Sequence, residues 1–391
     1  MKKILGLLLA LCLIAGCTSV FAAGIPVEQV KIGYITIGDE NEGYSANHLN
    51  GLKEAQAALG ISDDQVLCKY NVPETEDAYE AAIDLAEQGC NIIFATSFGH
   101  ESYVFQAAAE YPDIQFCHAT GTAAMSSPLN NVHNYFYAVY ESRYVSGVVA
   151  GMKLAQMIED GTITAENAKI GYVGAFPFAE VISGFTSFFL GARSQCPSVT
   201  MEVRYTNSWG DMALEKETAE ALIADGCVLI SQHADTTGAP SACEAAGVPC
   251  VGYNISMLPV APNTALTSAA GDWGAYVTYA VKCLIDGEEI ARDWCKGYAE
   301  GAVYTTELND SIVAPGTAEK VAELEEAFKA GTVKVFDTST FTVNGETLTS
   351  YTTAYGLEGI EMVSDGEFHE SSVRSAPYFD ILIDGITAVV E

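Results

Sequence analysis

The hydrophobic positions after residue 26 fall into short blocks that alternate between two periodicities. Residues 30–37 (VKIGYITI) form a continuous apolar, β-branched run, which is typical of a strand buried on both faces. Strands are then expected at 66–70, 91–96 and 114–118, with helices at 46–58, 75–88 and 99–110. Repeated βα units of this length predict a right-handed, doubly wound parallel sheet of the α/β class.

The same alternation restarts near residue 139. Helices are expected at 139–157, 181–194, 212–225 and 239–246, and strands at 169–173, 200–205, 228–232 and 250–253. A strand at 265–270 then leads into a long helix at 273–286. The pattern predicts two α/β lobes in one chain, joined by short hinges.

The lobe boundaries and the tail can also be placed on the sequence. We expect residues 28–139 plus about 268–310 in the first lobe, and 140–267 plus about 311–340 in the second. From residue 335 the sequence pattern predicts short strands, with a hairpin over 340–351 that turns at Asn344-Gly345. Residues 341–391 are therefore expected to form a β-rich extension on the second lobe.

The N-terminus has the pattern of a secretory signal. Lys2 and Lys3 precede an apolar run over 4–14 that is too short to cross a bilayer, and the text then reads Ile-Ala-Gly-Cys up to Cys17. This predicts a lipoprotein signal peptide over 1–17, with lipid on Cys17. The alternative is an ordinary cut after Ala22 or Ala23. The lipoprotein reading predicts an exported protein anchored at the extracytoplasmic face of the cell membrane.

Charge and cysteine content exclude several classes of function. The formal net charge is −33, which repels nucleic acid. Eleven cysteines leave nine after Cys12 and Cys17, an odd number without metal-site spacing, so neither a disulfide framework nor a metal site is expected. The pairs Cys243/Cys250 and Cys283/Cys295 stay open as bridges.

Candidate binding residues follow the carboxyl ends of the predicted strands, where open α/β sheets bind ligands. None of these segments contains Lys or Arg, which favours a neutral or cationic ligand over a phosphate or carboxylate. Their aromatic residues suit a flat ring held by stacking. The candidates at or near these strand ends are Asp39, Tyr44, Ser45, Asn47, Phe98, His118, Trp209, His233, Asp235, Asn254, Asp272 and Trp273.

Catalytic patterns are absent from the sequence. It contains no G-x-S-x-G, P-loop, H-E-x-x-H or EF-hand motif, so we expect neither an enzyme nor a cofactor. Cys117 directly precedes His118 within a predicted strand. Because neighbouring side chains on a strand point to opposite faces, these two residues cannot form a dyad.

Several segments, taken in order, resemble the basic membrane protein (BMP) family. They are residues 96–99 (TSFG), 118–121 (HATG), 140–151 (YESRYVSGVVAG), 188–194 (FFLGARS), 206–209 (TNSW) and 232–235 (QHAD). These proteins are substrate-binding lipoproteins of ABC transporters, and purine-nucleoside receptors are their best-understood branch. The resemblance runs from about residue 31 to 332.

The resemblance implies a type I periplasmic-binding-protein fold with a ligand between two lobes. It implies a purine clamped by Tyr44 and Trp209, with a permease and an ATPase as partners. Asn254 stands where the family usually has an Asp for ribose, and residues 272–274 (DWG) are similar to a branch that binds free nucleobases such as adenine. Base and nucleoside therefore both stay open, beside a sugar or signalling furanone, or a surface sensor without transport.

Overall fold

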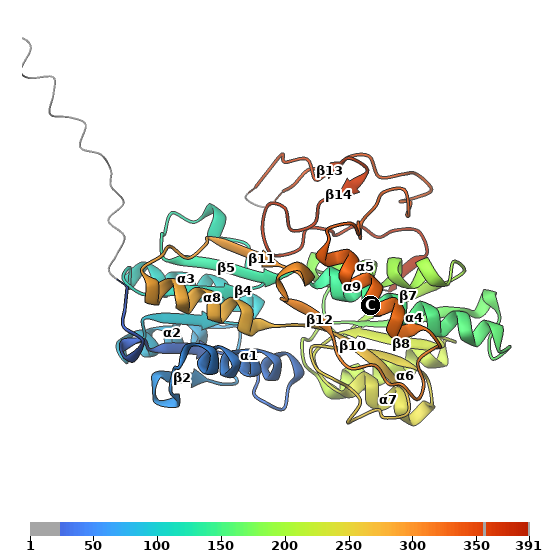
Figure 1. Cartoon of the computed structure of the whole chain (residues 1–391), viewed down its shortest axis with the longest axis horizontal. Helices are drawn as coiled ribbons and strands as arrows, with labels where there is room; N and C mark the ends of the chain where they lie inside the picture. Colours follow the sequence, from blue (N-terminus) through green and yellow to red (C-terminus); the bar gives the residue numbers. More distant parts are fainter. Residues whose placement is uncertain (1–23, 355–356, 390–391) are drawn as a thin grey trace, which may run out of the picture.

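The computed structural model describes residues 24–354 and 357–389, which form two α/β lobes and a C-terminal extension (Figure 1). The first lobe contains a parallel sheet of order β11-β5-β4-β3-β1-β2. Its strands are β1 (Ile32–Ile35), β2 (Val66–Lys69), β3 (Ile92–Ala95), β4 (Gln115–Ala119), β5 (Val132–Tyr137) and β11 (Asp293–Lys296), and its helices are α1 (Gly43–Leu59), α2 (Glu76–Glu87), α3 (Glu101–Glu110) and α8 (Trp273–Asp286).

The second lobe contains a sheet of order β12-β10-β9-β8-β6-β7-β15, in which only β12 is antiparallel. Its strands are β6 (Lys169–Gly174), β7 (Thr200–Tyr205), β8 (Leu229–His233), β9 (Cys250–Tyr253), β10 (Ala265–Gly271), β12 (Val303–Thr305) and β15 (Ile386–Val389). Its helices are α4 (Val139–Glu159), α5 (Ala179–Gln195), α6 (Met212–Ala224), α7 (Gly238–Ala246) and α9 (Thr317–Lys329). Two parallel sheets with helices packed against them confirm the expected α/β class and the type I periplasmic-binding-protein fold.

Local sequence explains where the elements begin and end. All four residues of β1 and of β3 are buried, as expected of strands covered by helices on both faces. Helix α1 starts after Glu42, whose carboxylate accepts hydrogen bonds from the backbone N–H of Tyr44 (2.6 Å) and of Ser45 (2.8 Å). It ends at Gly60, which has a left-handed φ of 72°.

The chain crosses between the lobes three times. It passes from β5 to α4, from β10 to α8, and from β11 to β12. Strand β10 stays in the second sheet as far as Gly271, because it pairs in parallel with β9. The return to the first lobe therefore starts at Asp272, whereas the sequence analysis had placed it near residue 268. β12 belongs to the second sheet, although residues up to about 310 were expected in the first lobe.

The extension is mostly irregular and contacts both lobes. It contains the short pair β13 (Val363–Ser364) and β14 (Glu367–Phe368), and it ends in β15 at the edge of the second sheet. Its own small core includes Phe336, whose ring stacks on Phe379 at 4.6 Å. The hydroxyl of Ser375 donates to Oδ1 of Asp293 on β11 at 2.7 Å, which ties the extension to the first lobe as well.

The expected hairpin is reduced to its turn. Asn344 (φ 53°) and Gly345 (φ 81°) are both left-handed, which is the conformation of a tight hairpin turn. Val343 and Glu346 exchange two backbone hydrogen bonds, at 2.8 and 3.1 Å, but no longer ladder is formed by the flanking described residues. The strands predicted over 340–351 are therefore a single bridge.

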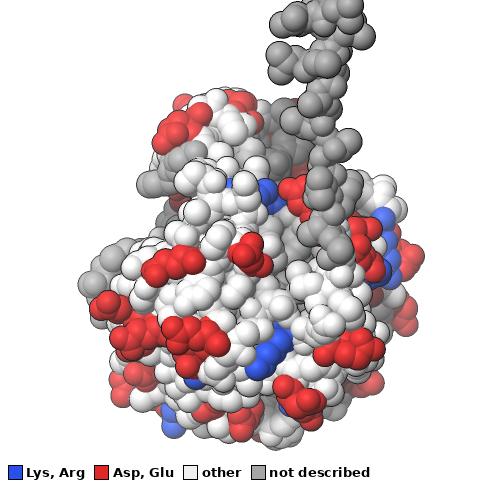
Figure 2. All heavy atoms as spheres, turned by 90° about the vertical axis from the view of Figure 1, so that its left-hand side faces the viewer, with Lys and Arg blue, Asp and Glu red and all other residues white. Residues whose placement is uncertain are grey.

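Three further observations concern the whole chain. In the described ranges, no helix is long and apolar enough to span a membrane. The nine cysteines between residues 24 and 389 are all free thiols, so neither open pair forms a disulfide in this structure. One face carries scattered Asp and Glu and few Lys or Arg (Figure 2). The predicted lipidation site Cys17 lies outside the described residues.

Candidate ligand-binding site

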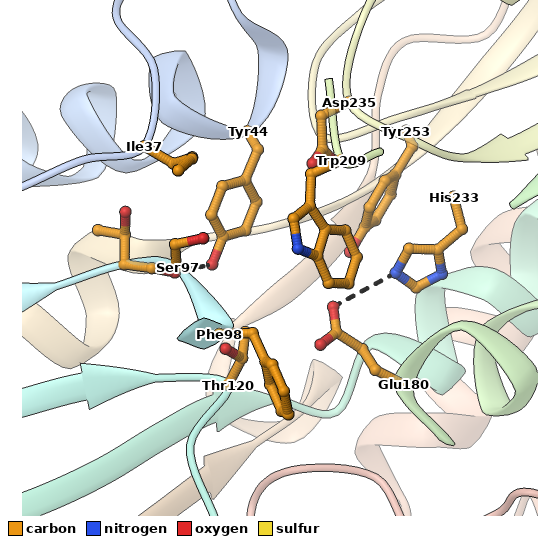
Figure 3. A pocket seen from close by; sticks show the side chains of 11 residues that line it. Ile37, Tyr44, Ser97, Phe98, Thr120, Glu180, Trp209, His233, Asp235 and Tyr253 are labelled. Carbon is orange, nitrogen blue, oxygen red and sulfur yellow. Dashed lines mark hydrogen bonds and ion pairs between the residues drawn. The ribbon is translucent and has the colours of Figure 1, made fainter. Parts of the chain in front are cut away.

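A small cavity lies between the two lobes (Figure 3). It is closed from the first lobe by the residues that follow β1, β3 and β4, and from the second by those at the ends of β6, β7, β8 and β9. The position agrees with the rule that ligands bind beyond the carboxyl ends of parallel strands. Its lining consists of Ile37, Tyr44, Thr96, Ser97, Phe98, Thr120, Glu180, Trp209, His233, Asp235 and Tyr253.

Two aromatic rings from opposite lobes line this cavity. The hydroxyl of Tyr44 on α1 donates to the carbonyl of Thr96 at 2.6 Å, and its ring meets His48 edge-on at 4.6 Å. Trp209, in the loop after β7, is half-buried and packs against Phe176 at 5.1 Å. Tyr44 is therefore held rigidly by the first lobe, and Trp209 is supported from behind by a second aromatic ring.

Direct contacts between the lobes show that the cleft is closed. The ring of Phe98 in the first lobe stacks on Phe178 of the second, with centroids 5.3 Å apart and planes at 29°. The backbone N–H of Gly43 donates to the carbonyl of Asp235 at 3.0 Å. A Cβ at position 43 would lie 2.8 Å from that oxygen, so a glycine is required for this approach.

The loop after β8 is fixed from several sides. The side-chain amide of Gln232 donates to the carbonyls of Ala234 (2.6 Å) and Thr236 (2.9 Å). The carboxylate of Glu215 accepts from the backbone N–H of Thr236 at 3.2 Å. Together these hydrogen bonds fix the backbone on both sides of Asp235, whose side chain lines the cavity.

Asp235 belongs to a group of buried carboxyl groups at the closed interface. Its Oδ1 accepts from the amide of Asn254 at 2.9 Å, yet burial and then the nearby Glu42 and Glu215 hold its pKa well above the ordinary value. Burial also raises the pKa of Glu42, and it raises that of Glu215 to about 7. The site thus concentrates acids that favour the protonated form.

Glu180 is a site residue that the sequence analysis missed. It lies in the first turn of α5, its side chain is only 12% exposed, and it lines the cavity beside Tyr253. Burial raises its pKa to about 8. Its position in the first helical turn after β6 could have identified it, because ligands bind beyond the carboxyl ends of such strands. Thr96, Ser97, Thr120 and Ile37 were missed because small or aliphatic residues carry no chemical signal.

The structure brings five of the predicted residues to the cavity wall and places the other seven elsewhere. Tyr44, Phe98, Trp209, His233 and Asp235 line the cavity. Asn47, Asn254 and Asp272 border a separate open groove near the crossings, and Ser45 caps the backbone N–H of Gly38 at 3.0 Å. Asp39 accepts from Asn41 at the surface, and Trp273 is core, stacked on His48 at 3.9 Å.

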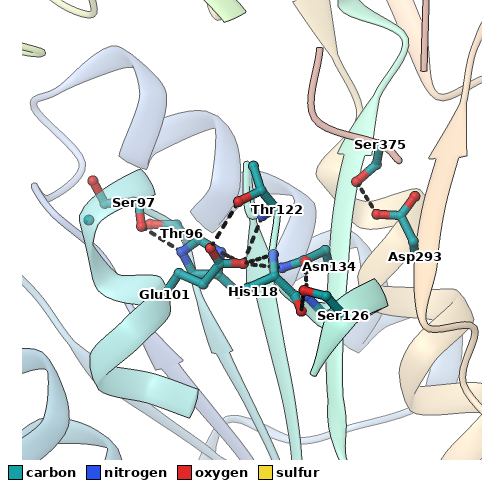
Figure 4. A network of polar contacts seen from close by, with 12 residues as sticks. Thr96, Ser97, Glu101, His118, Thr122, Ser126, Asn134, Asp293 and Ser375 are labelled. Carbon is teal, nitrogen blue, oxygen red and sulfur yellow. Dashed lines mark hydrogen bonds and ion pairs between the residues drawn. The ribbon is translucent and has the colours of Figure 1, made fainter. Parts of the chain in front are cut away.

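His118 is part of a polar network inside the first lobe (Figure 4). Its Nε2 lies 2.7 Å from the carbonyl of Ser97, and because a carbonyl only accepts, this nitrogen carries the hydrogen. Oε1 of Glu101 accepts from the backbone N–H of Thr122 (2.8 Å) and from the amide of Asn134 (2.9 Å). His118 therefore supports the Ser97 loop from inside the lobe. Separately, no cluster of His, Cys, Asp or Glu in the described ranges could hold a metal ion.

Comparisons with known proteins identify the family of the chain. The family model for PnrA-like substrate-binding proteins of ABC transporters matches residues 35–335. A purine-binding protein of Brucella abortus is 34% identical over 79% of this chain and 83% of its own length. A putative ABC transporter glucose-binding protein of Haloferax volcanii is 30% identical over 85% of this chain and 81% of its own.

The solved structures support the fold. A solute-binding protein of an ABC transporter system from Aeropyrum pernix superposes with a TM-score of 0.66 at 18% identity, over 78% of this chain and 93% of its own. A second, from Conexibacter woesei, gives 0.61 at 21% identity over 78% and 98%. The fold, the interlobe site and the family match lead to one conclusion: the chain belongs to the PnrA-like, or BMP, family of ABC transporter substrate-binding proteins.

Proposed function

We propose that this protein binds a purine in the interlobe cavity and hands it unchanged to the permease of an ABC importer. The observation that carries the proposal is the pair of rings, Tyr44 and Trp209, which reach the same closed cavity from opposite lobes. Aromatic rings on both sides of a slot suit a flat heterocycle, and stacking of a base on such a ring is worth about 1–3 kcal/mol. The purine-binding relative from Brucella abortus supports the same class of ligand.

The cavity favours a free base over a nucleoside. The cavity is small in this closed form, which favours the smaller of the two ligands. None of the eleven lining residues is Lys or Arg, which agrees with an uncharged ligand. Asn254, where the family usually has an Asp for ribose, donates its amide to Asp235 and borders the neighbouring groove.

A sugar is the second candidate ligand. The carboxyl groups of Glu180 and Asp235 could accept hydrogen bonds from hydroxyl groups, and the relative from Haloferax volcanii is named as a putative glucose-binding protein. Titration calorimetry with adenine, guanine, adenosine and glucose separates the two classes. Recovery of the bound compound unchanged by chromatography tests whether the protein binds without catalysis.

Trp209 is the residue whose substitution tests the clamp. Trp209→Ala should weaken purine binding by about 10–100-fold, because one stacking face is lost, while Trp209→Phe keeps a ring and most of the affinity. The unfolding temperature without ligand should change little, since Trp209 is half-buried. Equal purine affinity of wild type and Trp209→Ala would contradict the proposed clamp.

We also propose that lipid on Cys17 holds the protein at the extracytoplasmic membrane face. The proposal is supported by the sequence around Cys17 and by a family that serves ABC importers. Wild type should partition into Triton X-114, and Cys17→Ser should lose that partition. Equal partition of both proteins would favour cleavage after Ala22 or Ala23.

A further inference from the structure

A buried group of three ionisable side chains lies at the cavity wall, centred on Glu180. Oε1 of Glu180 lies 3.4 Å from Nε2 of His233, and Figure 3 shows the carboxyl group between this ring and the cavity. The guanidinium of Arg143 lies behind His233, with Nη1 donating to the carbonyl of Gln232 at 2.7 Å and the group stacked on the ring of Tyr253 at 3.7 Å. Of these three, Glu180 and His233 line the cavity and Arg143 does not.

The arrangement leaves Glu180 without a charge partner of the usual kind. Arg143 directs one nitrogen to a backbone carbonyl and its face to Tyr253, and its Nε and Nη2 have no hydrogen-bond partner among the described residues. Burial, and then the adjacent Arg143, lower the pKa of His233 well below its ordinary value, so the ring is neutral. Burial raises the pKa of Glu180 to about 8, although Arg143 opposes that shift. Near pH 7 the carboxyl group is therefore mostly protonated.

We propose that Glu180 selects the ligand as a neutral carboxylic acid, which donates one hydrogen bond to an acceptor on the ligand edge and accepts one from the adjacent N–H. A carboxylate could only accept, so it would fit an edge with two neighbouring donors. A neutral acid fits an edge with a donor beside an acceptor. Adenine has such an edge at its amino group and either flanking ring nitrogen, and hypoxanthine has one at its lactam.

This inference rests on the proposed purine function and makes it narrower. Unsubstituted purine keeps one such edge, N9–H beside N3, whereas 9-methylpurine has none and can satisfy only half of the pairing. 9-Methyladenine or 9-methylhypoxanthine should therefore bind wild type about tenfold or more tightly than 9-methylpurine, since one lost hydrogen bond to a buried partner has this effect.

The variants Glu180→Gln and Glu180→Met distinguish the neutral acid from the carboxylate. A glutamine amide also carries a donor beside an acceptor, so Glu180→Gln should keep the affinity for the better of adenine and hypoxanthine within about threefold at pH 7. Methionine fills similar space but provides neither group, and Glu180→Met should lose about tenfold or more.

The pH profile of binding is the second readout. Relative to Glu180→Gln, the affinity of wild type should stay constant below pH 7 and fall as pH rises through 8 to 9.5, approaching tenfold per unit, because binding requires the proton on Glu180. Asp235 in the loop after β8, Glu74 of the first lobe, and Arg143 also interact electrostatically with this carboxyl group. The pKa values of Tyr44 and Tyr253 are raised out of this range. Glu180→Gln keeps Asp235 and its neighbours, so the pH profile of this variant measures their contribution to affinity. That profile should be much flatter than the wild-type profile.

The outcomes separate this inference from the function on which it rests. If wild type binds no purine base at any pH, both fall together. If purines bind but Glu180→Gln loses as much affinity as Glu180→Met, or if affinity rises with pH, the carboxylate is the working form and the inference alone is overturned. Unchanged affinity in Glu180→Met overturns it as well.

Discussion

Tyr44 combines a proposed binding surface with a structural hydrogen bond, and substitution to phenylalanine separates the two. Its hydroxyl donates to the carbonyl of Thr96, and its side chain is only 7% exposed. Tyr44→Phe should lower the free energy of unfolding by about 1 kcal/mol, because the buried carbonyl loses a donor, yet it keeps the ring and purine affinity within about threefold. Tyr44→Ala should lower both, with a stability loss of about 3–5 kcal/mol. Urea denaturation and calorimetry measure the two effects; unchanged stability of Tyr44→Phe would contradict the structural role.

Gly184 is required for the approach of α5 to His233. A Cβ at this position would lie 2.5 Å from Nδ1 of His233, and this buried ring, packed against Tyr253, cannot move away easily. Gly184→Ala should therefore displace the imidazole, lower the free energy of unfolding by about 1–3 kcal/mol and weaken ligand binding. Ser194→Ala on the same helix removes only a hydroxyl bonded to the carbonyl of Gly191 and should change stability by less than about 0.5 kcal/mol. Equal stabilities of the two variants in urea denaturation would contradict this account.

The sequence predicted the aromatic and charged part of the site better than the rest. Tyr44, Trp209, His233 and Asp235 follow strand ends, and the rule of binding beyond carboxyl ends found them. Trp273 also follows a strand end, but it is the first residue of α8 and its ring turns inward onto His48. Which side of a loop faces the cleft depends on tertiary packing, and the order of residues does not encode it locally.

The loop after β8 and the start of α1 make closure of the lobes sensitive to pH. Burial raises the pKa values of Glu42 and Asp235, and that of Glu215 to about 7, so the closed form binds protons more tightly than an open, hydrated cleft. Protons that bind the closed form more tightly favour it; closure should be strongest near pH 5.5 and weaken as pH rises through 7.

Small-angle X-ray scattering of the ligand-free protein measures this equilibrium. The radius of gyration should increase between pH 5.5 and 8.5. Glu42→Gln removes one charge but keeps an oxygen for the backbone N–H groups of α1, so its increase should be smaller. A radius that stays constant or decreases over this range would show that these carboxyl groups do not oppose closure.

At the scale of elements, continuous apolar strands and capped helices were predictable, and short or mixed ones were not. The strand and helix blocks of both lobes agree with the structure within a few residues. β5 was missed because His133 and Asn134 interrupt its apolar run, and β12 because three residues carry no periodicity. α9 was also missed, although its apolar positions recur at helical spacing and predict a helix.

The extension connects the two lobes, and this contact should influence opening. β15 belongs to the second sheet, while Ser375 donates to Asp293 on β11 of the first. Ser375→Ala removes that bond, which favours the open form and lowers apparent affinity by the fraction of closed protein lost, about two- to fivefold. Ser350→Ala is a matched control, because its hydroxyl bonds only to Glu361 inside the extension. Calorimetry with the tightest purine compares them, and equal affinities would show that the contact does not limit opening.

Each sheet has an edge strand that comes late in the sequence, and this order affects when each lobe can fold. The edge strand β11 of the first sheet comes after residue 292, and the edge strand β15 of the second comes after residue 385. Neither sheet can be completed while the ribosome is still making these segments, and pairing of strands so distant in sequence is slow. The first sheet can therefore be completed earlier in synthesis than the second, whose edge strand β15 lies much later in the chain than β11.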